Sequence, residues 1–148
     1  MTASARQDLA VAAALLEQGS RIDALSRLLT AAALVALPLL AAFAPLSAAI
    51  AWIVLGLTIA LGLGQLYFAV CVGIYAAIFR ALAAQETGPD LPALDRALQA
   101  QGLLPPHKGG RPVEARIAGA RRLLARQAVL LVAQIAFLVF GALLMALR

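Results

Sequence analysis

Two long stretches of the chain carry no charged side chain, and they restrict the fold more than any other feature. No Asp, Glu, Lys or Arg lies between Arg27 and Arg80, or between Arg126 and Arg148. A helix needs about 20 apolar residues to cross a bilayer core, so the first stretch (about 52 residues) is long enough for two spans and the second (about 21 residues) for one. The sequence therefore predicts an all-α integral membrane protein with three transmembrane helices.

Composition supports the same class of protein. Only 13% of the residues are charged and 64% are hydrophobic, which is too little polar material to cover a water-facing globule. A single soluble domain is the competing interpretation. It is disfavoured because buried soluble helices seldom run to this length without a charge.

The expected spans are residues 28–44, 48–79 and 127–147 of a single membrane domain, 1–148. Pro38 predicts a kink in the first span, and residues 44–47 predict a tight turn that makes the first two spans antiparallel neighbours. The second span, about 48 Å long, exceeds a core of about 30 Å, so it tilts or extends at its cytoplasmic end. Trp52 and Tyr75, about 35 Å apart along a helix, suggest the two interfaces.

The remaining segments, 1–27 and 80–126, are expected to form amphipathic helices outside the spans. In the first, residues 4–18 predict a helix, Gly19 and Ser20 interrupt it, and Ser20 with Asp23 can cap the next one. In the second, Asp90 and Gly102 delimit a short helix with Leu91, Leu94 and Leu98 on one face. Residues 104–112 predict a linker, and a helix resumes after Pro112 and runs into the third span.

Orientation follows from the basic residues. Of the 12 Lys and Arg residues, all but Arg148 lie in segments 1–27 and 80–126. The positive-inside rule predicts that these two segments are cytoplasmic and that the C-terminus lies outside, as in a multi-pass protein of the cytoplasmic (inner) membrane.

Few residues are suited to catalysis. The expected spans contain no Asp, Glu, His, Lys or Arg, and the only histidine, His107, lies in the linker. Cys71, the only cysteine, lies in an apolar run and is interpreted as a small hydrophobe. The run His107–Arg111 lacks the spacing of a phosphate-binding loop. We therefore expect no enzyme, no cofactor and no metal site.

The helix after Pro112 carries the main candidate binding residues. Its apolar positions form one stripe, and Arg116, Arg121, Arg122 and Arg126 project elsewhere. A basic amphipathic segment beside a span is expected to bind anionic lipid headgroups. The alternatives are that these arginines only fix the topology or that they contact a protein. Nucleic-acid binding is not expected, because no aromatic residues alternate with them.

Helix packing is predicted from small and amide side chains. Gly56, Ala60 and Gly64 recur every fourth residue in the second span, a spacing that lets helices approach closely. The partner is an intramolecular helix, a second copy or another protein. Gln65 and Gln134, the strongest polar groups at depth, are expected to bridge the second and third spans, or alternatively to line a pore.

These features favour a small non-catalytic membrane protein, an accessory, scaffold or regulatory subunit of a larger assembly. One alternative is a homo-oligomeric, holin-like pore lined by Thr58 and Gln65. Another is a lipid-handling protein whose loop helices control access between the spans.

Overall fold

The computed structural model describes residues 3–43, 49–85, 90–102, 104–105, 107 and 109–147. Every regular element among them is a helix. The elements in chain order are α1 (Ala3–Glu17), α2 (Gly19–Phe43), α3 (Ala49–Ala83), α4 (Leu91–Ala100) and α5 (Val113–Ala146). The turn expected at 44–47 lies outside the described residues.

Three helical segments are long and apolar enough to cross a membrane: Ser4–Ala42, Ala49–Ala83 and Val113–Leu144. The first joins α1 to α2 across the short break at Gln18, and α2 continues through Pro38. The prediction of an all-helical protein with three such helices is confirmed, and the fold is compatible with a multi-pass membrane protein. At 1.5 Å per residue, α3 and α5 are each about 50 Å long, well beyond a bilayer core of about 30 Å.

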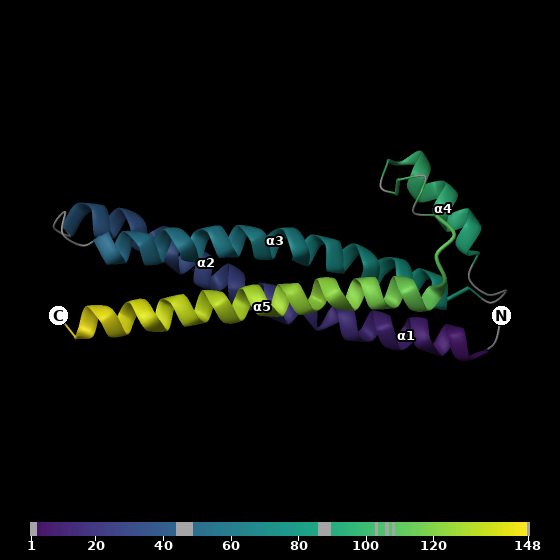
Figure 1. Cartoon of the computed structure of the whole chain (residues 1–148), viewed down its shortest axis with the longest axis horizontal. Coiled ribbons are helices and arrows are strands. Elements are labelled where there is room, and N and C mark those ends of the chain that lie inside the picture. Colours follow the sequence, from purple (N-terminus) through teal and green to yellow (C-terminus); the bar gives the residue numbers. More distant parts are fainter. Residues whose placement is uncertain are drawn as a thin grey trace.

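The long helices form a narrow bundle (Figure 1). α3 is the central helix and packs against α1, α2 and α5. α2 and α3 are antiparallel, because Thr30 lies beside Gly62 and Gly19 lies beside Val72. α4 projects to one side of the bundle at the end where the N-terminus lies (Figure 1), and its Leu91 and Leu94 pack against buried side chains of the bundle.

Local hydrogen bonds explain where the helices begin. Asp90 caps α4 as expected, since its Oδ1 accepts a 2.9 Å hydrogen bond from the Ala93 amide, and Gly102 follows the helix with φ +69°. Ser20 does not act as the expected cap. Its hydroxyl donates a 2.7 Å hydrogen bond to the Glu17 carbonyl, so it ties α2 back to the end of α1. Asp23 pairs with Arg27 at 2.5 Å instead.

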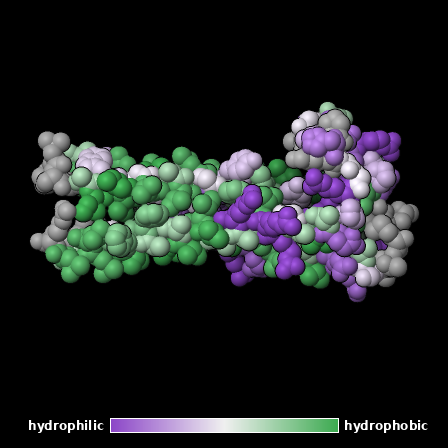
Figure 2. Space-filling model, in the orientation of Figure 1, coloured by the Kyte–Doolittle hydropathy of each residue, from purple (hydrophilic) through white to green (hydrophobic). Residues whose placement is uncertain are grey.

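The surface of the bundle divides into two halves along its length. Figure 2 shows apolar residues over the half that holds the C-terminus and polar residues over the half that holds the N-terminus and α4. The apolar half exposes large hydrophobic side chains from all three helices, among them Leu34, Val35, Leu39, Ile53, Leu63, Val132, Val139 and Phe140.

The hydrophobic core lies in the polar half. It joins α1, α3 and α5 through Leu9, Ala12, Ala13, Leu16, Val72, Ala76, Phe79, Leu82, Val113 and Ala120. Burial of apolar side chains stabilises structure only where water is the alternative environment. The core therefore occupies the half of the bundle whose surface is suited to water.

Candidate functional site

The interior of the apolar half combines small apolar side chains with polar ones. Beside Ala33, Ala51 and Val54 it buries hydroxyl and amide side chains from α2, α3 and α5, namely Ser26, Thr58, Gln65 and Gln134, and Gln127 lies at the junction with the hydrophobic core; each of these five is no more than 1% exposed. Where lipid surrounds a bundle, hydrogen bonds and close packing replace the hydrophobic effect between helices. The polarity of interior and surface is thus inverted relative to the other half.

Gln134 joins three helices. Its Oε1 accepts a 2.8 Å hydrogen bond from Ser26 Oγ of α2. Its Nε2 donates to Thr30 Oγ1 of α2 at 3.0 Å and to the Thr58 carbonyl of α3 at 3.2 Å. The Thr30 and Thr58 hydroxyls each donate to a carbonyl one turn back in their own helix. This side chain connects α5 to both α2 and α3.

Gln65 is buried in the same interior but makes no comparable bridge. Neither amide atom has a hydrogen-bond partner among the described residues. One oxygen of Asp23 and Oε1 of Gln127 are unpartnered as well. Thr58 and Gln65 both face the inside of one protomer, so copies that assembled around a pore would not present them to it in this conformation.

Gln127 is a packing residue that sequence reasoning missed. Its Nε2 donates a 2.9 Å hydrogen bond to the Gly19 carbonyl, which fixes the start of α2 on α5. The available sequence signal was an amide side chain at the edge of a charge-free stretch. The buried residues of α5 recur every seventh position, namely Val113, Ala120, Gln127, Gln134 and Gly141, the repeat of packed long helices.

The small residues of α3 fall on two faces. Gly56 and Ala60 are exposed, and a Cβ added at Gly56 would meet open space, whereas Gly64 is half-buried beside Leu130. The closest helix approach is at Gly62, where a Cβ would overlap the Thr30 side chain, and a second is at Gly141 against Val54. Gly56 and Ala60, which were predicted to pack against another helix, therefore have no packing partner among the described residues. Packing of these two residues against another molecule stays a prediction.

Arg116 has a partner within the chain. Its Nη2 lies 2.8 Å from both carboxylate oxygens of Asp95 in α4, and its Nε donates to the Arg111 carbonyl at 3.0 Å. The Asp95 carboxylate also accepts a 2.8 Å hydrogen bond from the Gly110 amide, and the two side chains are only about a tenth exposed. This cluster holds α4 and the linker against the start of α5.

The Asp95 carboxylate is stabilised in its charged form. Burial alone would raise its pKa, but the hydrogen bonds from Gly110 and Arg116 and the Arg116 charge outweigh that effect and lower the pKa below its ordinary value. Arg116 is thus engaged in holding α4. Arg121, Arg122 and Arg126 are exposed, so the headgroup prediction now depends on these three.

A groove of about 370 Å³ lies beside that cluster. One wall is a face of α3, formed by Tyr67, Cys71, Ile74, Tyr75 and Ile78. The opposite wall is α5 with Ala115, Arg116 and Gly119, and Leu98 of α4, Leu104 and Arg111 complete the lining. It is an apolar furrow between two long helices with α4 beside it.

Other polar groups pair across helices or stand alone. Arg80 of α3 binds Glu17 of α1 through Nη2 and Nε, which joins the two helices at the polar end. Among the described residues, no three His, Cys, Asp or Glu side chains gather as metal ligands.

Comparison with protein-family models, curated proteins and solved structures finds no match for this chain.

Proposed function

We propose that this chain is a non-catalytic, multi-pass protein of the cytoplasmic membrane, and that it serves as an accessory or scaffold subunit by docking a transmembrane helix of a larger assembly. The observation that carries the proposal is the position of Gly56 and Ala60. They lie on the side of α3 opposite to the buried residues Val54, Thr58 and Gly62, and open space lies beyond Gly56.

Small residues on a lipid-facing stripe favour contact with another helix, because they let the two backbones approach and gain dispersion contacts. The chain satisfies its own packing elsewhere. α3 meets α2 at Gly62 and α5 at Val54, so the Gly56 face is not needed to hold the protomer together. The Gly56 face of α3 is apolar and has small side chains, so a transmembrane helix of another protein is the partner that it fits.

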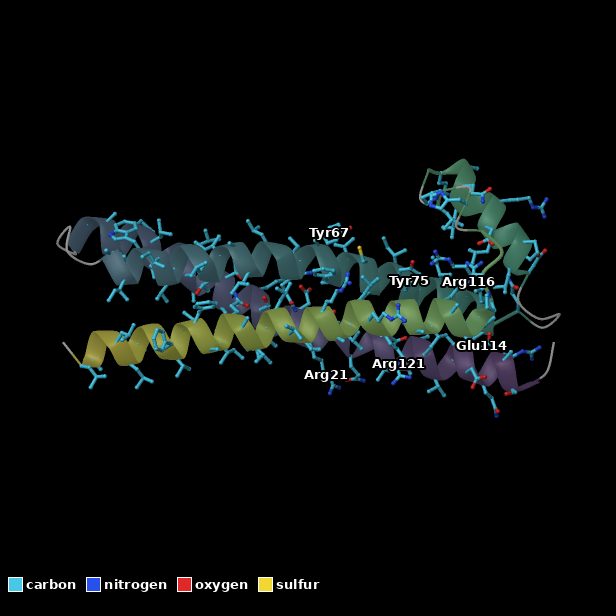
Figure 3. The ribbon with its side chains drawn as sticks, viewed as in Figure 1. Arg21, Tyr67, Tyr75, Glu114, Arg116 and Arg121 are labelled. Atoms are coloured by element: carbon cyan, nitrogen blue, oxygen red, sulfur yellow. The ribbon has the colours of Figure 1, made fainter. Side chains whose placement is uncertain are left out.

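The depth of the membrane can be set from charged and aromatic residues. Figure 3 shows that Arg21 and Tyr67 lie at the same position along the long axis of the bundle, and that Arg121 and Tyr75 do so nearer the polar end. If Tyr75 marked the interface, Arg21 would lie in hydrocarbon, at a cost of a few kcal/mol. We therefore place the cytoplasmic boundary near Tyr67; Arg27 lies about one turn deeper, and its long exposed side chain reaches back to the interface. The distance from Ala49 to Tyr67 is then about 27 Å along α3, close to the thickness of a bilayer core.

With this boundary, α1, α4, the end of α3 and the first half of α5 form a cytoplasmic domain around the hydrophobic core. Arg121, Arg122 and Arg126 then lie just above the membrane plane, where each exposed arginine contributes about 1 kcal/mol of attraction to anionic lipid. The positive-inside rule gives the orientation, with the N-terminus in the cytoplasm and the C-terminus outside.

Cysteine labelling tests the orientation in a Cys71→Ala background. Leu147→Cys is expected to react with a membrane-impermeant maleimide in intact cells, because Leu147 is 84% exposed at the outer end. Gln101→Cys, which follows α4, is expected to react only after the cells are permeabilised. The opposite pattern would overturn the orientation, and labelling of both in intact cells would overturn the membrane placement.

Partner docking is tested by copurification in mild detergent. Gly56→Leu adds a side chain to the outward face and is expected to reduce recovery of the partner or of a second copy. Gly73→Leu is the matched control, because a Cβ at Gly73 also meets open space but lies outside the proposed hydrocarbon layer. Equal recovery from the two variants would contradict the docking face.

A further inference from the structure

The groove between α3 and α5 has a feature that the proposed function does not use. Its α3 wall begins at Tyr67, where we place the cytoplasmic boundary, and continues away from the membrane through Cys71 and Tyr75 to Ile78. It is thus an apolar furrow that starts at the bilayer surface and rises about 16 Å into the cytoplasmic domain. An apolar groove that faces water is typical of a ligand-binding site.

Among the residues that the structure describes, the charged side chains lining the groove are both basic: Arg111 and Arg116. The Asp95 carboxylate neutralises Arg116, and Arg111 is exposed at the end of the groove that is farther from the membrane. The lining therefore combines an apolar channel, continuous with the bilayer, and a net positive charge at its upper end.

We propose that the groove binds an anionic phospholipid of the cytoplasmic leaflet, raised above its neighbours. The phosphate lies against Arg111, and one acyl chain runs down past Tyr75 and Cys71 to Tyr67 and into the bilayer. In this position Arg111 pairs with the phosphate, and the apolar walls of the groove cover the part of the chain that has left the bilayer. A peptide or a second copy would gain no advantage from a furrow that opens directly into lipid.

Two details of the walls suit an acyl chain. On α5 the groove is lined by Ala115 and Gly119, and a Cβ added at Gly119 would meet open space, so the hollow exists because these residues are small. α4 borders the groove through Leu98, and the hydrogen bonds of Asp95 to Arg116 and Gly110 hold α4 in that position. The site is thus built from the same cluster that fixes α4.

Cys71, the only cysteine, lies in the groove and can report on its occupancy. The purified protein in mild detergent is titrated with dioctanoyl phosphatidylglycerol, and the rate of Cys71 alkylation by a neutral maleimide is measured. At about ten times the dissociation constant, binding should slow alkylation roughly tenfold. Phosphatidylcholine of the same chain length should protect much less, and inorganic phosphate should not protect.

Variants locate the binding site. Arg111→Gln should abolish protection by phosphatidylglycerol, whereas Arg96→Gln, the loss of one exposed charge that does not line the groove, should leave it intact. Gly119→Leu should reduce the number of phospholipids retained in native mass spectrometry, and Gly73→Leu should not. Equal protection by the two lipids, protection by inorganic phosphate, or unchanged protection in Arg111→Gln would each overturn the proposal.

Protection that rises with protein concentration in the absence of lipid would also overturn the lipid proposal, because it would identify a second copy as the occupant. None of these measurements uses Gly56. The lipid site and the docking of a partner helix can therefore fail independently.

Discussion

Ser26 of α2 donates a 2.8 Å hydrogen bond to Oε1 of Gln134 in α5, and both side chains are fully buried in the apolar half of the bundle. At the other end, Phe79, Leu82 and Leu16 pack together in the hydrophobic core. Each half thus uses the interaction that its surroundings leave available: hydrogen bonds where the exterior is apolar, and apolar burial where the exterior is polar. This division is the strongest physical support for a bundle that is partly inside and partly outside a membrane.

The polar interior gives a first prediction. Gln134→Leu removes hydrogen bonds to Ser26, Thr30 and the Thr58 carbonyl, and we expect it to destabilise the protein by about 1–2 kcal/mol in detergent. Gln65→Leu should be neutral or stabilising, because its amide has no partner to lose. Thermal unfolding of the two variants measures the difference. An equal loss in Gln65→Leu would mean that ordered water or a ligand pairs with that amide.

Close helix approach gives a second prediction. Gly62→Ala places a methyl group where the Thr30 side chain lies, so α2 and α3 must separate, at a cost of about 1–3 kcal/mol. Gly56→Ala, the same change on the opposite face, adds a methyl group in open space and should leave the stability of the protomer unchanged or slightly higher. A similar melting temperature for both variants would show that the two helices are not in tight contact at Gly62.

The docking of α4 should depend on pH. The folded-state pKa of Asp95 is lowered, so the carboxylate's contribution is complete above its ordinary pKa of about 3.8 and is lost as the pH falls through the lowered value. Pulsed EPR distances between spin labels at Gln99 and Glu114, in a Cys71→Ala background, should be narrowly distributed near neutral pH and broad in strong acid. Asp95→Asn should broaden them at every pH. A narrow distribution in Asp95→Asn would show that other contacts hold α4.

Several parts of the fold followed from residue types alone. The charge-free stretches predicted three long helices, and Asp90 and Gly102 predicted the ends of α4, because hydropathy and capping are local properties. The Asp95–Arg116 pair left no such signal. Its members are 21 residues apart and meet only because the linker folds back.

The packing face of α3 shows a different kind of limit. A spacing of four residues, as in Gly56, Ala60 and Gly64, drifts around a helix with 3.6 residues per turn. The face that is buried within the chain combines steps of three and four residues, through Ala51, Val54, Thr58, Gly62 and Gln65. Small side chains indicated where a helix can approach, but only the apolar and polar partners on α2 and α5 determine which face does so.

The four arginines that one sequence pattern grouped together are expected to separate by function. Arg116→Glu places two carboxylates opposite each other in a mostly buried cluster and should release α4, which the spin-label distance between Gln99 and Glu114 would report as a broad distribution. Combined reversal of Arg121, Arg122 and Arg126 to Glu should leave that distance narrow, because all three are exposed. It should instead weaken binding to anionic vesicles by about 3 kcal/mol, relative to the parent protein, or disturb insertion. The control is binding to vesicles of phosphatidylcholine alone, which should not change. If the triple variant binds anionic vesicles like the parent, the three arginines have no headgroup role, and a protein contact becomes their expected function.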